Sequence, residues 1–152
     1  MKEFVDFSSD CVFAFHVPRF FNRLPKKSGK RYQYRFSCVS ERNIYGMSGD
    51  KYGISGASHL DDLMYLFDAK HASLPIDKNG KSYKMIQQSC ALFTNFAKYG
   101  NPTQTMPNVT WKEYDDNKSY LDIAEELTPG NHLDADVIAF WKTIYESAGL
   151  EF

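Results

Sequence analysis

The sequence predicts a mixed α/β fold that is mostly helical, and three segments carry this prediction. Residues 81–99 and 133–148 repeat apolar side chains at the spacing of an amphipathic helix. Residues 32–39 alternate aromatic or thiol side chains with polar ones, as a strand with one buried face does. Apolar residues are spread along the chain without an internal repeat, a low-complexity tract or a long linker, so we expect one structural unit.

Composition excludes several classes of partner. The formal net charge is -1 and the isoelectric point is near 6.4, so no overall field attracts nucleic acid or an anionic membrane surface. No apolar stretch approaches the roughly 18 residues of a membrane-spanning helix, and the first residues lack the apolar core of a signal peptide. The one basic cluster has a turn composition and is interpreted as a solvated loop; it comprises Arg23, Lys26, Lys27, Lys30 and Arg31, around Pro25, Ser28 and Gly29.

Neither the cysteines nor the glycosylation sequons indicate the cellular compartment of the protein. The three cysteines Cys11, Cys38 and Cys90 lie far apart, with no paired spacing, so we expect buried thiols. Two tripeptides that begin at Asn108 and Asn117 match the N-glycosylation sequon in a polar, turn-rich stretch. Such tripeptides often occur by chance, and the localisation stays open.

The first half of the chain is expected to hold a helix, a strand and a loop. Residues 4–24 have mostly helical spacing, with Ser8, Ser9 and Asp10 as candidate N-caps and Pro18 as a kink or interruption. The strand over 32–39 follows. Residues 40–58 then contain four glycines among asparagine, aspartate and serines, which is loop chemistry.

The second half is expected to hold two long helices and one short strand. An acidic pair, Asp61 and Asp62, opens a short helix, and the helix over 81–99 stops at Gly100-Asn101-Pro102. Within the turn-rich stretch that follows, residues 120–123 are interpreted as an edge strand. Asn131 or Asp134 can cap the last helix, and Gly149 follows its final turn.

His59 is the candidate site residue. It closes the glycine-rich loop after the clearest strand, where a rigid sheet can aim an imidazole at a nucleophile. On the residues alone an ordinary loop histidine is the commoner interpretation. A metal site formed with Asp61, Asp62 and His71 matches neither H-E-x-x-H nor a calcium loop, so we predict no metal and no cofactor.

Packing or solvent exposure is expected to explain the other two histidines. His16 lies on an apolar helix, and His132 lies in a terminal turn.

The motifs taken together resemble the carboxylesterase type B family, and insect carboxylesterases in particular. Residues 10–18 resemble the family's D-x-x-F helix, and residues 32–36 its last catalytic strand. The run Gly56-Ala57-Ser58-His59-Leu60-Asp61-Asp62 is similar to the G-x-x-H-x-D/E-D/E segment. Residues 93–102 resemble W-x-x-F-A-x-x-G-x-P, with Phe93 or Leu92 at the place of tryptophan. Further matches continue the resemblance over roughly residues 4–148: Trp111, Tyr120-Leu121-Asp122-Ile123 and Phe140-Trp141.

The resemblance implies that residues 1–152 are the C-terminal part of a single α/β-hydrolase domain: the last catalytic strand, the histidine loop and the C-terminal helices. His59 is then the general base of a Ser-His-Glu/Asp triad, and the substrate of the complete enzyme is a small-molecule carboxylic ester. Leu60 stands where many members have glycine or alanine, so the pocket beside the histidine is expected to differ in shape.

The sequence lacks the other parts of that machinery. It contains no G-x-S-x-G elbow, and the nearest strings, which hold Ser48 and Ser55, place the second glycine one residue early. Asp61 and Asp62 are too close in sequence to replace the acid. The isolated chain is therefore predicted to be inactive, and its expected partner is the N-terminal portion of the fold, with the nucleophile and the oxyanion hole.

Two alternatives stay open. The parent protein could be a noncatalytic esterase-like binding or adhesion module that has lost the triad, although retention of His59 argues mildly against it. The chain could also be a stable binding domain of its own. A lone catalytic strand would then leave unpaired backbone and an uncovered aromatic face, which disfavours this second alternative.

Overall fold

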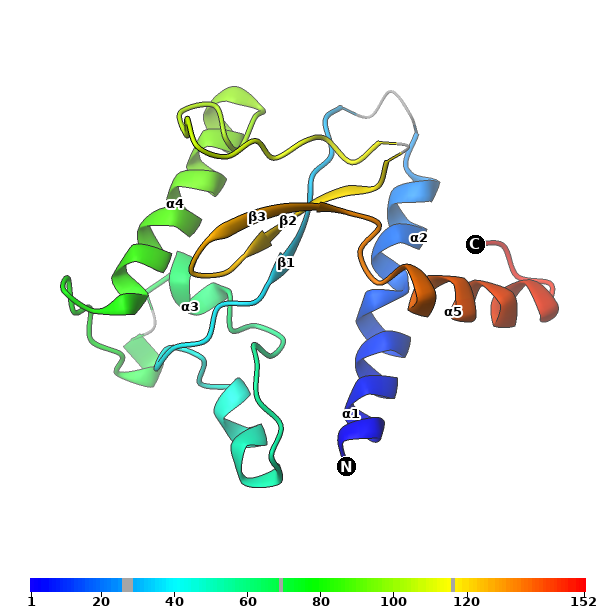
Figure 1. Cartoon of the computed structure of the whole chain (residues 1–152), viewed down its shortest axis with the longest axis horizontal. Helices are drawn as coiled ribbons and strands as arrows, with labels where there is room; N and C mark the ends of the chain where they lie inside the picture. The colour runs from blue at the N-terminus through cyan, green and yellow to red at the C-terminus, as the bar shows by residue number, and fades with distance from the viewer. Residues whose placement is uncertain (26–28, 69, 116) are drawn as a thin grey trace. The chain divides into compact units, whose positions relative to one another are not determined.

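The computed structural model describes residues 1–25, 29–68, 70–115 and 117–152 (Figure 1). Lys26, Lys27 and Ser28 of the predicted basic loop lie outside the described residues, as does the side chain of His71. In chain order the elements are α1 (Lys2–Ser9), the π-helix η1 (Asp10–Ala14), α2 (His16–Arg23), β1 (Gln33–Phe36), the 3-10 helix η2 (Gly46–Tyr52), α3 (Leu63–Leu66), the 3-10 helix η3 (Lys70–Ala72), α4 (Lys81–Tyr99), β2 (Ser119–Ile123), β3 (Leu127–Asn131) and α5 (Ala135–Ser147).

The chain divides into two compact units. One unit combines Met1–Lys30 with His132–Phe152 and holds α1, α2 and α5. The other, Arg31–Asn131, holds the sheet, the loop that carries His59 and the helix α4.

The sheet has three strands in the order β1-β2-β3. β1 runs parallel to β2, with Tyr34 opposite Leu121, and β2 runs antiparallel to β3, with Leu121 opposite Pro129. The strand expected over residues 120–123 is present as β2, but its placement at an edge is wrong, because β3 pairs with the far side of β2. The sequence pattern does not predict β3, because its Pro129 and Gly130 are poor strand formers. An edge strand nevertheless tolerates both residue types.

Gly130 of β3 is required by close packing across the sheet. A Cβ atom at this position would lie 2.6 Å from ring carbons of Tyr120, its partner on β2. The Tyr120 ring therefore covers the glycine, and this contact fixes the register of an otherwise weak strand.

Helix α4 matches its predicted bounds and packs its apolar side against the sheet. It ends at Gly100, whose φ of 63° is the left-handed conformation of a helix C-cap. Leu92 of α4 is fully buried and forms a core cluster with Trp111 and with Leu121 and Ile123 of β2. A second cluster joins Met85 of α4 to the segment around α3; its buried members are Cys38, Met64, Tyr65 and Met85.

The first helical segment begins earlier than its candidate caps suggested. α1 starts at Lys2, so Ser8 and Ser9 lie inside the helix rather than at its N-terminus. The predicted interruption is present as the π-helix η1, just ahead of Pro18, where the Phe15 amide bonds to the Asp10 carbonyl oxygen at 3.1 Å. A wider turn here is compatible with a proline that cannot donate to the helix and crowds the preceding carbonyl.

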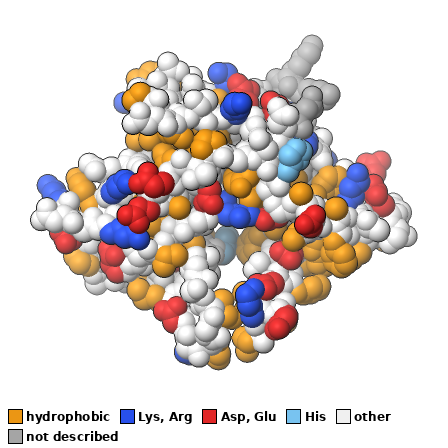
Figure 2. Space-filling view, in the orientation of Figure 1, with side chains coloured by type: hydrophobic (Ala, Val, Ile, Leu, Met, Phe, Trp, Pro, Cys, Tyr) orange, Lys and Arg blue, Asp and Glu red, His pale blue; other side chains and the backbone are white. Residues whose placement is uncertain are grey.

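The helical unit packs around one aromatic residue and exposes others. Phe15 is fully buried, with its ring centroid 4.7 Å from that of Tyr145 and 6.4 Å from that of Trp141. In contrast, Phe4 is 68% exposed and Phe140 is 59% exposed. Figure 2 shows apolar side chains gathered over α5. No helix in the described residues is both long and apolar enough to cross a membrane.

We predict that the isolated chain binds the dye ANS and associates in solution, because exposed apolar surface of this extent is unusual for a soluble monomer. ANS fluorescence and size-exclusion chromatography of the purified chain test this. A monodisperse monomer with a sharp thermal transition and no dye binding would contradict it.

Candidate active site

His59 lies in the long loop that connects β1 to α3. The loop runs outward through the 3-10 helix η2 and returns through an extended stretch to a turn over residues 58–62. The His59 side chain is exposed on this turn. The loop thus starts at the C-terminal end of a parallel strand, the position from which a sheet can present a catalytic group.

One buried carboxylate joins the outgoing and returning parts of this loop. Asp61 has no exposed surface, and its Oδ1 accepts the backbone N–H of Tyr45 at 3.0 Å. Its Oδ2 accepts the backbone N–H of Ser58 at 2.8 Å and of Gly46 at 3.1 Å, and the Asn43 side-chain amide at 3.3 Å. Four donors satisfy the buried charge, so the Asp61 carboxylate fixes the backbone on both sides of His59.

Gly46 allows the two parts of the loop to approach. A Cβ atom there would lie 2.7 Å from the Gly56 carbonyl oxygen and 2.9 Å from Asp61 Oδ2. Both are closer than a carbon atom can approach without displacement. The residue is therefore needed for its lack of a side chain, since its backbone N–H must reach the carboxylate.

A buried polar network lies behind the carboxylate. The Tyr65 hydroxyl donates to Asn43 Oδ1 at 2.7 Å and lies 2.6 Å from Ser40 Oγ, while the Asn43 amide donates to the Cys38 carbonyl oxygen at 2.8 Å. Burial raises the pKa of the Tyr65 phenol, so it remains a donor. Asn43 thereby connects Asp61 to the core cluster that contains Cys38 and Tyr65.

A buried arginine ties the same loop to α3. Arg42 is 2% exposed, and its Nε donates to the Met64 carbonyl oxygen at 2.8 Å. Its Nη1 donates to the Pro75 carbonyl oxygen at 3.2 Å. The guanidinium thus satisfies backbone oxygens that would otherwise be buried without donors.

The residue after His59 has an unusual backbone. Leu60 has a φ of 76°, the left-handed region in which a side chain costs about 1–2 kcal/mol. Its carbonyl oxygen accepts the Leu63 amide at 3.1 Å and so belongs to the turn that starts α3. This geometry gives a physical reason why glycine suits a position where this chain carries leucine.

Both acidic residues beyond His59 are engaged in structural contacts. Asp61 binds the donors described above, and Asp62 Oδ2 accepts the Tyr34 hydroxyl at 2.8 Å. Burial, and then the hydrogen bond to Asp62, raise the pKa of the Tyr34 phenol. Asp62 therefore links the histidine turn to β1.

The other candidate residues have local surroundings of their own. His16 packs against the rings of Phe15 and Tyr145, with centroid distances of 5.5 and 6.3 Å. Ser48 lies within η2, and Ser55 is exposed on the returning stretch, so neither serine lies on a tight turn that leads directly from a strand into a helix. Among the described residues, no three histidine, cysteine or acidic side chains form a group that could hold a metal ion.

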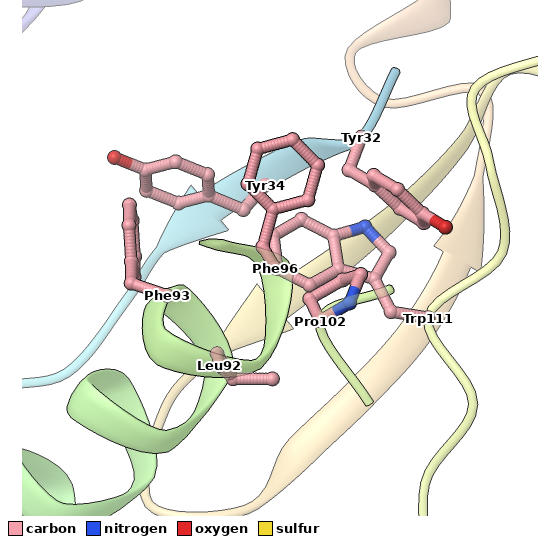
Figure 3. A pocket seen from close by; sticks show the side chains of 7 residues that line it. All are labelled: Tyr32, Tyr34, Leu92, Phe93, Phe96, Pro102 and Trp111. Carbon is pink, nitrogen blue, oxygen red and sulfur yellow. The ribbon is translucent and has the colours of Figure 1, made fainter. Parts of the chain in front are cut away.

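An apolar cavity of about 130 Å³ lies between α4 and β1 (Figure 3). Its polar wall atoms are already bonded: Tyr34 to Asp62, the Tyr32 hydroxyl to the Gly100 carbonyl oxygen, and the Trp111 indole to the Gln33 carbonyl oxygen. The cavity therefore offers carbon surface without a catalytic group. Its lining consists of Tyr32, Tyr34, Leu92, Phe93, Phe96, Pro102 and Trp111.

Sequence reasoning missed most of the residues that hold the histidine loop. Asn43 and Gly46 are typical of a loop, Tyr65 belongs to the apolar run after Asp62, and no local pattern marks Arg42. The one available signal was the presence of polar side chains, Asn43 and Asp61, at both ends of a glycine-rich segment. Their pairing across the loop is a tertiary contact that spacing does not reveal.

Comparison with known proteins identifies similar sequences. A sequence profile of the carboxylesterase family matches residues 1–141. Bile salt-activated lipase of Rattus norvegicus is 32% identical over 153 residues, covering 95% of this chain and 24% of the lipase. Carboxylesterase 1C of Mus musculus is 31% identical over 114 residues, covering 72% of this chain and 18% of that enzyme. The chain thus spans about a quarter, or less, of the length of these relatives.

Solved structures are similar in fold. An esterase of Clostridium hathewayi has a TM-score of 0.55 at 16% identity, over 76% of this chain and 21% of that one. A carboxylesterase of Geobacillus stearothermophilus has a TM-score of 0.51 at 13% identity, over 72% of this chain and 21% of that one. These similarities confirm the α/β-hydrolase fold class expected from the sequence.

We predict that Asp61→Asn loosens the loop, because an amide directs its own N–H groups at backbone donors and removes the charge that they stabilise. The free energy of local opening of the loop should fall by about 1–3 kcal/mol. Hydrogen exchange at the amides of Tyr45, Gly46 and Ser58 should then be faster by roughly 5- to 150-fold. Exchange measured by mass spectrometry tests this, with exposed Asp68→Asn as the control. Equal exchange in the two variants would contradict the role of Asp61.

We also predict that Gly46→Ala opens the loop, because the added methyl group displaces Gly56 or Asp61. An overpacking cost of about 1–3 kcal/mol should accelerate tryptic cleavage after exposed Lys51 in η2. Ser48→Ala, a change of an exposed residue on the same helix, is the control. Cleavage at the same rate in both variants would show that the close approach is unimportant.

Proposed function

The chain belongs to the carboxylesterase family, and on that basis we propose that it is the part of a carboxylic ester hydrolase that supplies the catalytic histidine, His59. One observation carries the proposal: His59 is exposed on a turn after the C-terminal end of β1, while the buried Asp61 carboxylate holds the backbone on both sides. A fixed backbone with an exposed imidazole suits a general base.

We further propose that residues 1–152 are the C-terminal part of a single α/β-hydrolase domain. Two observations support this. The chain spans 24% of the length of the lipase that it matches over 95% of its own length. Within the described residues, β1 pairs with β2 and has no strand on its other side, so its outer backbone edge is available to a further strand. The remaining portion of the domain would supply the serine, the acid and the oxyanion hole.

In the proposed reaction, the neutral His59 imidazole takes the proton of the serine hydroxyl as its oxygen attacks the ester carbonyl carbon. The tetrahedral intermediate collapses, the bond to the alcohol oxygen breaks, and the imidazolium protonates the leaving alcohol. The imidazole then deprotonates a water molecule that attacks the acyl-enzyme, which releases the carboxylic acid and restores the serine. This chain's contribution is to hold the imidazole where the serine can reach it.

The substrate class proposed is a carboxylic ester. The names of the sequence relatives, a bile salt-activated lipase and carboxylesterases, support this substrate class. The structurally similar esterase of Clostridium hathewayi can hydrolyse aliphatic aromatic polyesters. The pocket that selects the acyl and alcohol groups would lie largely in the remaining portion of the domain. Leu60, beside His59 and 38% exposed, is the residue of this chain placed to narrow it.

The isolated chain is expected to be inactive, because its sequence has no G-x-S-x-G. The complete domain should react with a fluorophosphonate probe at its serine. A complete domain that lacks the elbow serine and does not react would instead indicate a noncatalytic binding or adhesion module of the same fold.

We predict that His59→Asn in the complete domain lowers kcat for a simple carboxylic ester by about four orders of magnitude or more, because the serine loses its base. His132→Asn is the matched control, since His132 is exposed with a φ of 55° that asparagine tolerates. Steady-state hydrolysis of a chromogenic ester measures both. Retention of activity in His59→Asn, or equal losses in the two variants, would contradict the assignment.

A further inference from the structure

We propose that Asn108 is an N-glycosylation site and that Asn117, the acceptor of the second sequon, is left unmodified. The two tripeptides are equivalent as sequence, since both match the sequon. They differ in how the fold presents them. The inference is independent of the ester hydrolase function.

Asn108 lies at the tip of a loop that is fixed at its base. The Trp111 amide donates to Thr103 Oγ1 at 3.1 Å and closes the loop. Asn95 of α4 is 6% exposed and donates to the Pro102 carbonyl oxygen at 3.2 Å, which holds the loop to the helix. The tip therefore has a defined position on the surface of a compact unit.

The acceptor and the hydroxyl residue of this first sequon are both accessible. The side chains of Asn108 and Thr110 are exposed, whereas Val109 between them packs against the core cluster around Leu92 and Trp111. In the part of the chain that the structure describes, neither the Asn108 amide nor the Thr110 hydroxyl has a hydrogen-bond partner. Both groups that a transferase must recognise thus point away from the core, in irregular backbone.

The second sequon is incorporated into a turn and a strand. Ser119, its hydroxyl residue, is 2% exposed and donates to Asn131 Oδ1 at 3.1 Å as the first residue of β2. The backbone N–H of Asn117 donates to Asp115 Oδ1 at 2.8 Å, and Lys118 has a φ of 50°. A transferase would have to extract Ser119 from the sheet to bind its hydroxyl.

The modification is a group transfer from a lipid-linked oligosaccharide pyrophosphate. The Asn108 amide nitrogen bonds to the anomeric carbon of the first sugar, and the bond from that carbon to the pyrophosphate oxygen breaks. The lipid pyrophosphate leaves, and the amide nitrogen loses one proton. The attached glycan would hydrate the surface around the loop.

The test is expression of the full chain behind a cleavable secretion leader in eukaryotic cells. Whole-cell lysate is treated with peptide N-glycosidase F and followed by electrophoretic mobility. The variants are Asn108→Gln, Thr110→Ala, which removes the first sequon without changing its acceptor, and the matched control Asn117→Gln.

We expect the unmodified sequence to show one glycosidase-sensitive shift. Asn108→Gln and Thr110→Ala should abolish it, and Asn117→Gln should leave it unchanged. A shift that persists in Asn108→Gln, a second glycan, loss of the shift in Asn117→Gln, or the absence of any shift would each overturn the proposal.

Discussion

The conformation of the histidine loop depends on the hydrogen bonds that the buried Asp61 carboxylate accepts. An ionised carboxyl group without partners would be costly to bury, but four N–H donors from residues 43–46 and Ser58 surround this one. The donors come from residues 43–46, at the start of the loop section that contains η2, and from Ser58 beyond its end, so the carboxylate joins the two parts of the loop as a clamp. Gly46 makes this geometry possible, since any side chain there would occupy the space of the clamp.

The clamp matters because it is connected to the core. Asn43 joins Asp61 to Tyr65 and so to the cluster that α3 and α4 share, while Asp62 accepts the Tyr34 hydroxyl from β1. The turn of His59 is therefore held from the helix side and the sheet side. In a general base such rigidity is useful, because displacements of about 1 Å from the reactive geometry cost roughly a hundredfold in rate.

The regular elements were predictable from local pattern, and the interactions between them were not. α4 matches its expected bounds because an apolar stripe and a terminal glycine are both local signals. β3 is not predicted by local pattern because Pro129 and Gly130 are rare inside strands, and the contact of Gly130 with the Tyr120 ring is a tertiary one. His59 could be singled out from family motifs, but the positive φ of Leu60 and the Asp61 clamp depend on contacts across the loop.

We propose that Asp61 positions His59 for catalysis. The most direct test is the rate at which a fluorophosphonate probe labels the complete domain carrying Asp61→Asn, relative to Asp68→Asn and to the unchanged protein. We expect labelling to be about a hundredfold slower in Asp61→Asn, with probe affinity preserved and the Asp68→Asn rate unchanged. Equal labelling rates in all three proteins would contradict it.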